Sequence, residues 1–244
     1  MNKKIMKIFI YILFTSSLLS FLTFTYFDSY INSNDNIIIN KVAITNNEEI
    51  IESQLNEIEE IRSNYNNDDV IGKITISDTN INETIFQGDN NSYYLNHNGY
   101  KEYDQYGEVF LDYRINLNSS RKILIFGHNT SKGKTAFSEL ENYYDKSFYD
   151  NHKFITITLD NEIRNYEIFS VYVETSDWSY MNLNFNSNTD WYNHLLKLKN
   201  NSLYDTGIDI KEDDEVLILQ TCSYNQNYKD YNKKYLLLIS RRIG

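Results

Sequence analysis

From Val70 to the C-terminus, the sequence is a succession of short apolar runs separated by polar, turn-like segments. The runs cover residues 70–76, 81–86, 107–113, 121–126, 154–159, 164–173, 215–221 and 235–240. The chain has no proline, so Asn, Asp, Ser and Gly must build its turns. Two stretches with helical spacing interrupt the runs, at 137–148 and from Asn188 or Thr189 to about Leu198. This pattern predicts one mainly β domain, most simply a closed barrel.

The N-terminus has the composition of a membrane anchor. Three lysines within the first seven residues precede an uncharged run from Ile8 to Phe27. At about 1.5 Å per residue, this run is long enough to cross a bilayer as a helix. A cleaved signal peptide is the alternative, but no small-residue cleavage site follows the run. We therefore expect residues 1–27 to be an uncleaved single-pass anchor, with a cytoplasmic N-terminus and the rest of the chain outside.

The segment after the expected anchor divides into a tether and a globular part. Residues 28–45 are polar and rich in Asn, which is typical of a tether. From Asn46 to about Tyr65, isoleucines and a leucine recur at helical spacing among glutamates. We expect an amphipathic helix there, opening a globular domain over residues 46–244.

The run at 215–221 ends at Cys222, the only cysteine in the chain. A lone cysteine is often an inert buried residue. The end of a buried strand, however, is where a rigid scaffold presents a side chain to a groove, and this position suits a nucleophile. A single cysteine excludes an internal disulfide and a Cys-based zinc site. A net charge of −11 argues against a nucleic-acid partner.

A cysteine nucleophile needs a proton acceptor, because only a few per cent of a free thiol is ionised at neutral pH. His128 follows the buried run 121–126 directly and thus shares the strand-end position of Cys222. An imidazole there could form a thiolate–imidazolium pair. His97, in a loop rich in Asn, is the second candidate. The other two histidines, His152 and His194, have the sequence context of solvated or packing residues.

A third group must stabilise the oxyanion that forms when a thiolate attacks a carbonyl. If the last two strands pair as an antiparallel hairpin, the start of the second lies beside the end of the first. Lys233 and Lys234 are at that start. Arg241 is farther along by on the order of 23 Å, at about 3.3 Å per residue. We therefore expect Lys234, or else Lys233, to be this third group.

The order of these features resembles the sortases, the cysteine transpeptidases of Gram-positive cell surfaces. An anchor precedes a barrel, Gly127-His128-Asn129 follows one buried strand, and Leu219-Gln-Thr-Cys222 ends another. The resemblance is to class B in particular. It rests on further segments at 89–95, 107–114, 134–137 and 166–172 and on the helix at 189–201.

The resemblance implies an eight-stranded barrel with an N-terminal helical segment and a helix inserted before the cysteine strand. It implies that Cys222 attacks the threonine carbonyl of a sorting motif near a surface protein's C-terminus. His128 would protonate the leaving amine. An amino group of peptidoglycan, or of its lipid-linked precursor, would then release the thioacyl-enzyme. We expect no cofactor, no metal and a monomer.

Six groove residues are carried over from the same resemblance. They are Asn91, Leu95, Ser176, Tyr180, Met181 and Thr221. The chain also departs from the family. Lys234 stands where the family has an arginine, and a lysine lacks the planar fork that binds a substrate bidentately. Gln220 stands where class B usually has a serine.

Two other classes of protein remain open at this point. A hydrolytic cysteine peptidase is the first, but papain-like enzymes place the cysteine before the histidine, and caspase-like enzymes need a parallel α/β sandwich. The second is a membrane-tethered barrel that only binds, with an inert Cys222. Alkylation of the thiol would leave the function of such a module unchanged.

Overall fold

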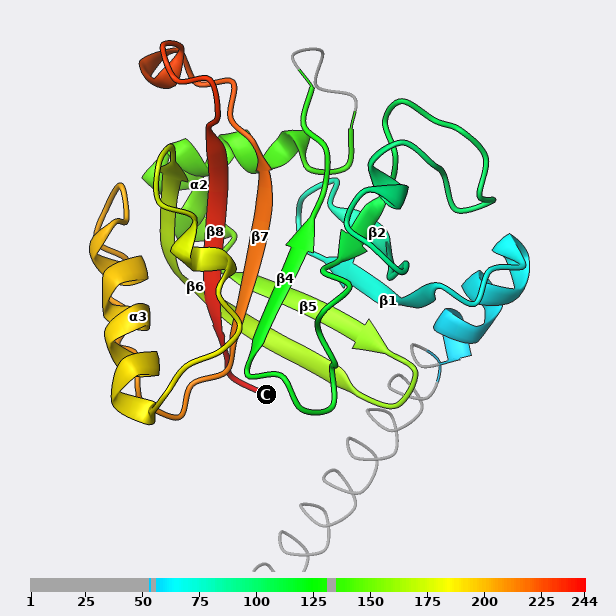
Figure 1. Cartoon of the computed structure of the whole chain (residues 1–244), viewed down its shortest axis with the longest axis horizontal. Helices are drawn as coiled ribbons and strands as arrows, with labels where there is room; N and C mark the ends of the chain where they lie inside the picture. The colour runs from blue at the N-terminus through cyan, green and yellow to red at the C-terminus, as the bar shows by residue number, and fades with distance from the viewer. Residues whose placement is uncertain (1–52, 54–55, 131–134) are drawn as a thin grey trace, which may run out of the picture. The chain divides into compact units, whose positions relative to one another are not determined.

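The computed structural model describes residues 53, 56–130 and 135–244. Within them, eight strands close into a barrel in the order β1-β2-β3-β4-β7-β8-β6-β5 (Figure 1). The strands are β1 (Val70–Thr75), β2 (Asn82–Phe86), β3 (Val109–Leu111), β4 (Lys122–Phe126), β5 (Phe154–Leu159), β6 (Ile163–Glu174), β7 (Val216–Cys222) and β8 (Tyr235–Arg242). The predicted closed barrel and each of its predicted strands are confirmed.

Two of the neighbouring pairs in the barrel are parallel, β2 with β3 and β4 with β7, and the others are antiparallel. The pair β4–β7 is the important one for the site. Because the two strands run in the same direction, their C-terminal ends reach the same edge of the barrel, at the top of the view (Figure 1).

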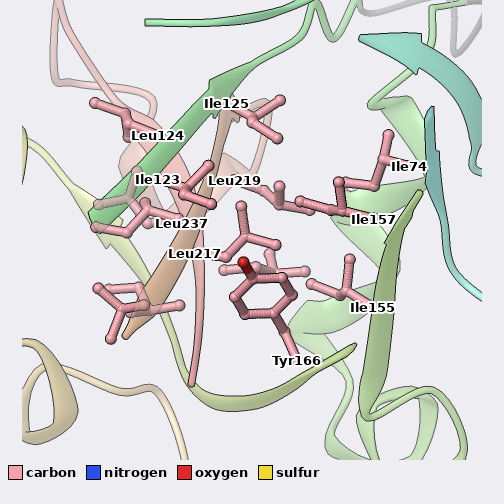
Figure 2. Packing of buried hydrophobic residues seen from close by; sticks show 14 of the residues in the cluster. Ile74, Ile123, Leu124, Ile125, Ile155, Ile157, Tyr166, Leu217, Leu219 and Leu237 are labelled. Carbon is pink, nitrogen blue, oxygen red and sulfur yellow. The ribbon is translucent and has the colours of Figure 1, made fainter. Parts of the chain in front are cut away.

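The barrel interior is filled by aliphatic side chains from facing strands. Ile123 and Ile125 of β4 point inward, toward Leu217 and Leu219 of β7 (Figure 2). Leu124 points to the other face of β4, yet it is also fully buried. Both faces of this strand are therefore covered, which explains its apolar run over 123–126. Burial of each such side chain contributes roughly 1.5–3 kcal/mol.

The predicted continuous helix over 137–148 is wrong in detail. The structure has a 3-10 helix η2 (Ser138–Tyr144) followed by a separate helix α2 (Lys146–Asn151). Asp145 divides them, because its backbone is extended and its side chain accepts a hydrogen bond from Ser147 N. A side chain in this arrangement caps a new helix instead of continuing the previous one.

The helix inserted before the cysteine strand is α3 (Asn188–Asn200), and its predicted inward residues Trp191, Leu195 and Leu198 are all buried. Its cap is Ser187, not the predicted Asn188 or Thr189: Ser187 Oγ accepts a hydrogen bond from Asp190 N at 3.1 Å.

Residues 56–65 are helical, as predicted for that part of the amphipathic segment. Ile58 is fully buried, and the Arg62 guanidinium donates to the Val70 carbonyl and to Asp160, so this helix is fixed to the barrel. The predicted anchor and tether, and most of the helix before residue 56, lie outside the described residues. Among the residues that are described, no helix is both long and apolar enough to span a membrane.

Candidate active site

The parallel pairing of β4 and β7 brings the ends of two strands side by side. Phe126 is the register partner of Gln220. The pairing continues beyond the strands, because Gly127 N donates to the Gln220 carbonyl at 3.1 Å and Thr221 Oγ1 donates to the Gly127 carbonyl at 2.7 Å. The next positions along are His128 and Cys222. Cys222 is the last residue of β7 and His128 lies two residues past the end of β4, and neighbouring strands lie about 4.8 Å apart.

His128 and Cys222 line one pocket of about 240 Å³. The wall consists of Asn91, Leu95, Phe110, Phe126, Gly127, His128, Met181, Gln220, Thr221, Cys222 and Tyr235. The wall is mainly apolar with a few polar residues, which is the usual composition of a small-ligand or peptide pocket.

The Cys222 thiol is half-buried, and burial raises its pKa above the usual 9.0. Desolvation has this effect because it disfavours the charged thiolate. Burial therefore favours the neutral thiol over the thiolate in the resting protein.

The His128 ring has a defined orientation. Its Nε2 lies 2.7 Å from the Leu95 carbonyl oxygen. Because a carbonyl oxygen only accepts, Nε2 must carry a proton, and Nδ1 is the nitrogen that remains for proton exchange in the neutral ring. Leu95 thus holds the ring through its backbone, besides lining the pocket with its side chain.

The segments after the two strands are joined by a hydrogen-bond network. Buried Asn129 donates from Nδ2 to the Cys222 carbonyl at 2.9 Å and to Glu141 Oε1 at 3.0 Å. The same Glu141 oxygen accepts from Tyr224 N at 2.8 Å. Burial raises the pKa of the Glu141 carboxyl group. This network fixes the residue after the histidine to the backbone of the cysteine.

Gly127 is the position where a side chain does not fit. A Cβ atom there would meet the Phe137 ring at 2.5 Å, closer than carbon atoms approach. The glycine therefore lets the His128 segment pass directly over a buried aromatic ring.

Four of the six groove residues expected from the sequence line the cysteine pocket: Asn91, Leu95, Met181 and Thr221. Asn91 is held in place because its Oδ1 accepts a hydrogen bond from Tyr113 N at 2.9 Å.

Two expected groove residues do not line the pocket. Ser176 is exposed, in the turn after β6. Tyr180 is buried in the 3-10 helix η3 (Trp178–Met181), where its hydroxyl donates to Gln220 Oε1 at 2.6 Å. Tyr180 thus contacts Gln220, a residue of the pocket wall, without lining the pocket itself.

The expected third group also lies outside the pocket wall. The register pairs Cys222 with Tyr235, one residue past Lys234. Lys234 contributes its carbonyl, which accepts from Ser223 N at 3.0 Å, and it is not among the lining residues. The Lys233 ammonium lies 6.0 Å from the centre of the Trp178 ring. Both lysines are therefore beside the pocket, not in it.

The second histidine candidate is held away from the pocket wall. The His97 ring stacks on Tyr93 with the ring centres 4.2 Å apart, and its Nδ1 lies 2.9 Å from the Tyr93 carbonyl. Of the four histidines, His128 alone is among the lining residues of the cysteine pocket. Within the described part of the chain, no three His, Cys, Asp or Glu side chains are grouped so that they could hold a metal ion.

Several residues of the site are not predicted from the sequence. Phe110, Phe126 and Tyr235 line the pocket, and Glu141 organises its edge. In the sequence, the aromatic residues have the pattern of ordinary core residues. Glu141 lies in a helical stretch with no local sign of its contacts to Asn129, twelve residues earlier.

Comparisons with known proteins agree with this geometry. The sortase domain family model matches residues 74–240. Sortase B of Listeria monocytogenes is 34% identical over 205 residues, which cover 82% of this chain and 78% of that protein. Sortase B of Staphylococcus aureus is 29% identical over 194 residues, 78% of this chain and 76% of that protein.

The fold is similar to that of solved sortases. The crystal structure of Clostridium perfringens sortase B matches with a TM-score of 0.69 and 29% identity, covering 76% of this chain and 100% of that one. The match of the family model over more than half of the chain is decisive. Together with the barrel and its strand-end cysteine, it shows that this chain belongs to the sortase family, as a cysteine transpeptidase similar to those of class B.

Proposed function

We propose that Cys222 cleaves a C-terminal sorting motif after its threonine and transfers the protein to an amino group. The observation that carries this proposal is the shared pocket of Cys222 and His128 at the ends of two parallel strands. Membership in the sortase family disfavours both a purely hydrolytic peptidase and an inert binding module.

The reaction has two steps. As the Cys222 sulfur attacks the threonine carbonyl carbon, the thiol gives its proton to His128 Nδ1 and the C–S bond forms. The C–N bond to the next residue then breaks, and the leaving nitrogen takes that proton from His128. An acceptor amine attacks the thioester and gives a proton to His128, which passes it to the sulfur as the C–S bond breaks. No net oxidation or reduction occurs.

The pocket residues have distinct roles in this proposal. Leu95, Met181 and Thr221 contact the motif around the threonine, and Asn91 offers a polar contact at the edge. Ser176 would contact a more distant part of the motif, because it lies in the turn beyond the pocket wall. Tyr180 positions Gln220, to which its hydroxyl is bonded.

Lys234 is proposed as the cation that stabilises the oxyanion, which its flexible side chain would reach from beside the pocket. Its position one residue before the partner of Cys222 supports this role. A lysine gives a point charge where an arginine would give a fork of two parallel donors. We therefore expect Lys234→Arg to retain or raise kcat/KM, and Lys234→Ala to lower it by tenfold or more, as measured with a sorting peptide.

The proposed acceptor is an amine of peptidoglycan or of its lipid-linked precursor, and the proposed donors are surface proteins. This assignment follows from the sortase family, whose members act at the cell surface. A single-pass anchor at residues 1–27, with a tether over 28–45, would hold the catalytic domain on the outer side of the membrane. The apolar run from Ile8 to Phe27 supports that part of the proposal.

The test is a peptide-library assay with the full-length chain. Threonine-containing sorting peptides are incubated with and without triglycine as the amine, and the products are separated by liquid chromatography. Transpeptidation predicts a peptide–triglycine product that needs both Cys222 and His128. If the peptides are cut at the same rate with or without amine, and only hydrolysis products form, the proposal is refuted in favour of a peptidase.

A further inference from the structure

A second cavity, larger than the cysteine pocket, lies where β4 begins. Its volume is about 920 Å³. It is lined by Arg114, Arg121 and Lys122, by two serines before β4, and by residues of the segment that leads into α3, among them Ser187 and Asn188. It shares no lining residue with the cysteine pocket. Lys122 precedes His128 by six residues, which is roughly 20 Å along an extended strand.

The lining of this cavity is cationic. Arg114, Arg121 and Lys122 contribute three positive groups, and no Asp or Glu is among the lining residues. Such a cluster is unexpected in a chain with a net charge of −11. Arg114 is paired with buried Asp112 at 2.6 Å. The Arg121 guanidinium donates from Nη1 to Asn188 Oδ1 at 2.9 Å and from Nη2 to the Glu212 carbonyl. Its neighbouring hollow is lined by acidic side chains, but among the described residues neither Arg121 nor Lys122 forms an ion pair with a carboxylate.

Lys122 is the most unusual of the three, because its side chain is buried at 2% exposure. Its Nζ donates to the Asn182 carbonyl at 2.8 Å and lies 2.8 Å from His194 Nε2. Burial, and then the charge of Lys122, lower the pKa of His194 to about 3, so the imidazole is neutral and Nε2 accepts. An ammonium group has three N–H donors, and two of them are thus used on neutral partners.

A buried ammonium without a counter-ion is costly. Burial, followed by the nearby charge of Arg114, lowers the pKa of Lys122 to about 7. Near neutral pH the group is therefore close to losing its proton. An anion beside it would offset the desolvation of the charge and restore the proton.

The other walls of the cavity favour a phosphate as that anion. Ser187 and Asn188 belong to the N-terminal end of α3, where the helix dipole favours negative charge. Guanidinium groups match the oxygens of a phosphate in geometry. The serine and asparagine side chains around the rim offer donors and acceptors for hydroxyl groups.

We propose that this cavity binds the phosphate group of a small polyhydroxylated molecule, such as a sugar phosphate, between Lys122 and Arg121. The volume is large enough for a sugar ring as well as the phosphate. The inference does not depend on the transpeptidase reaction, because the two pockets have separate walls.

Calorimetric titration of the full-length chain with glucose 1-phosphate, and with glucose as the neutral control, tests the proposal. We expect binding of the phosphate ester and none of glucose. Lys122→Met and Arg121→Gln should each weaken binding by about tenfold or more, since each removes a charged hydrogen-bond donor. Lys211→Met makes the same change of charge at an exposed position outside the cavity and should leave the affinity unchanged.

A second readout follows the lysine itself. With ¹³C-labelled lysine, the Cε resonance of Lys122 should titrate near pH 7 in the free protein and at a higher pH when glucose 1-phosphate is bound. Thermal unfolding of each variant checks that it is folded. If Lys122→Met does not fold, the affinity of Arg121→Gln decides the test. Equal affinity in all variants, equal binding of glucose, or an unmoved Lys122 titration would each overturn the proposal.

Discussion

The burial of Cys222 makes a quantitative prediction about the reactivity of its thiol. Desolvation raises the thiol pKa above 9.0, so at pH 6 to 8 the thiol is below its pKa and the thiolate is the minor form. There, each pH unit multiplies the thiolate by nearly ten. The rate of alkylation by iodoacetamide should therefore rise roughly a hundredfold between pH 6 and pH 8 without a plateau.

The assay is the pseudo-first-order loss of free thiol at each pH, followed by mass spectrometry of the intact chain. Cys222 is the only cysteine, so one adduct reports the site. N-acetylcysteine serves as the control for the reagent. His128→Gln should give nearly the same pH profile of alkylation, because the ionisation of a neutral thiol depends little on the neighbouring imidazole. A plateau below pH 8 that disappears in His128→Gln would instead reveal a preformed thiolate–imidazolium pair and show that the resting thiol is not neutral.

Substitutions at three positions test how the fold holds the site. Gly127→Ala should destabilise the protein by about 1–3 kcal/mol in urea unfolding and lower kcat, because the added methyl group overlaps Phe137. Asn129→Ala removes the donor to the Cys222 carbonyl and should lower the free energy of unfolding by about 1–3 kcal/mol. It should reduce the rate of peptide cleavage more than the affinity for the peptide, and equal losses would argue against a positioning role. Leu219→Ala should cost about 2–5 kcal/mol by the same unfolding assay, whereas Leu219→Ile should cost less than about 1.5 kcal/mol, and similar costs would contradict tight packing there.

Much of this fold could be predicted from the sequence because the strands carry a strong local signal. The unbroken apolar run of β7 marks a strand covered on both faces, and its polar end marks where it reaches the surface. The same reasoning placed His128 at the end of β4. Parallel pairing of β4 and β7 brings His128 and Cys222 to one edge of the barrel. Their proximity requires only that these two strands be neighbours.

The features of the fold and the site that the sequence does not predict depend on contacts between distant residues, which leave no local pattern. The hairpin between β7 and β8 was expected, but its register puts Tyr235 opposite Cys222, and that register is set by the long connection before it. Asp145 ends one helix and starts another through a single side-chain contact. The bond from Tyr180 to Gln220 spans forty residues, so the indirect role of Tyr180 could not be seen beforehand.

Intact-mass measurement of the chain during turnover of a sorting peptide tests directly whether Cys222 forms a thioester. We expect a thioacyl adduct on Cys222 whose mass is that of the peptide portion ending in threonine. The adduct should be absent in Cys222→Ala, should accumulate without amine, and should disappear when triglycine is added. Cleavage of the peptide by the Cys222→Ala variant, or cleavage with no adduct at any time, would show that Cys222 is not the nucleophile.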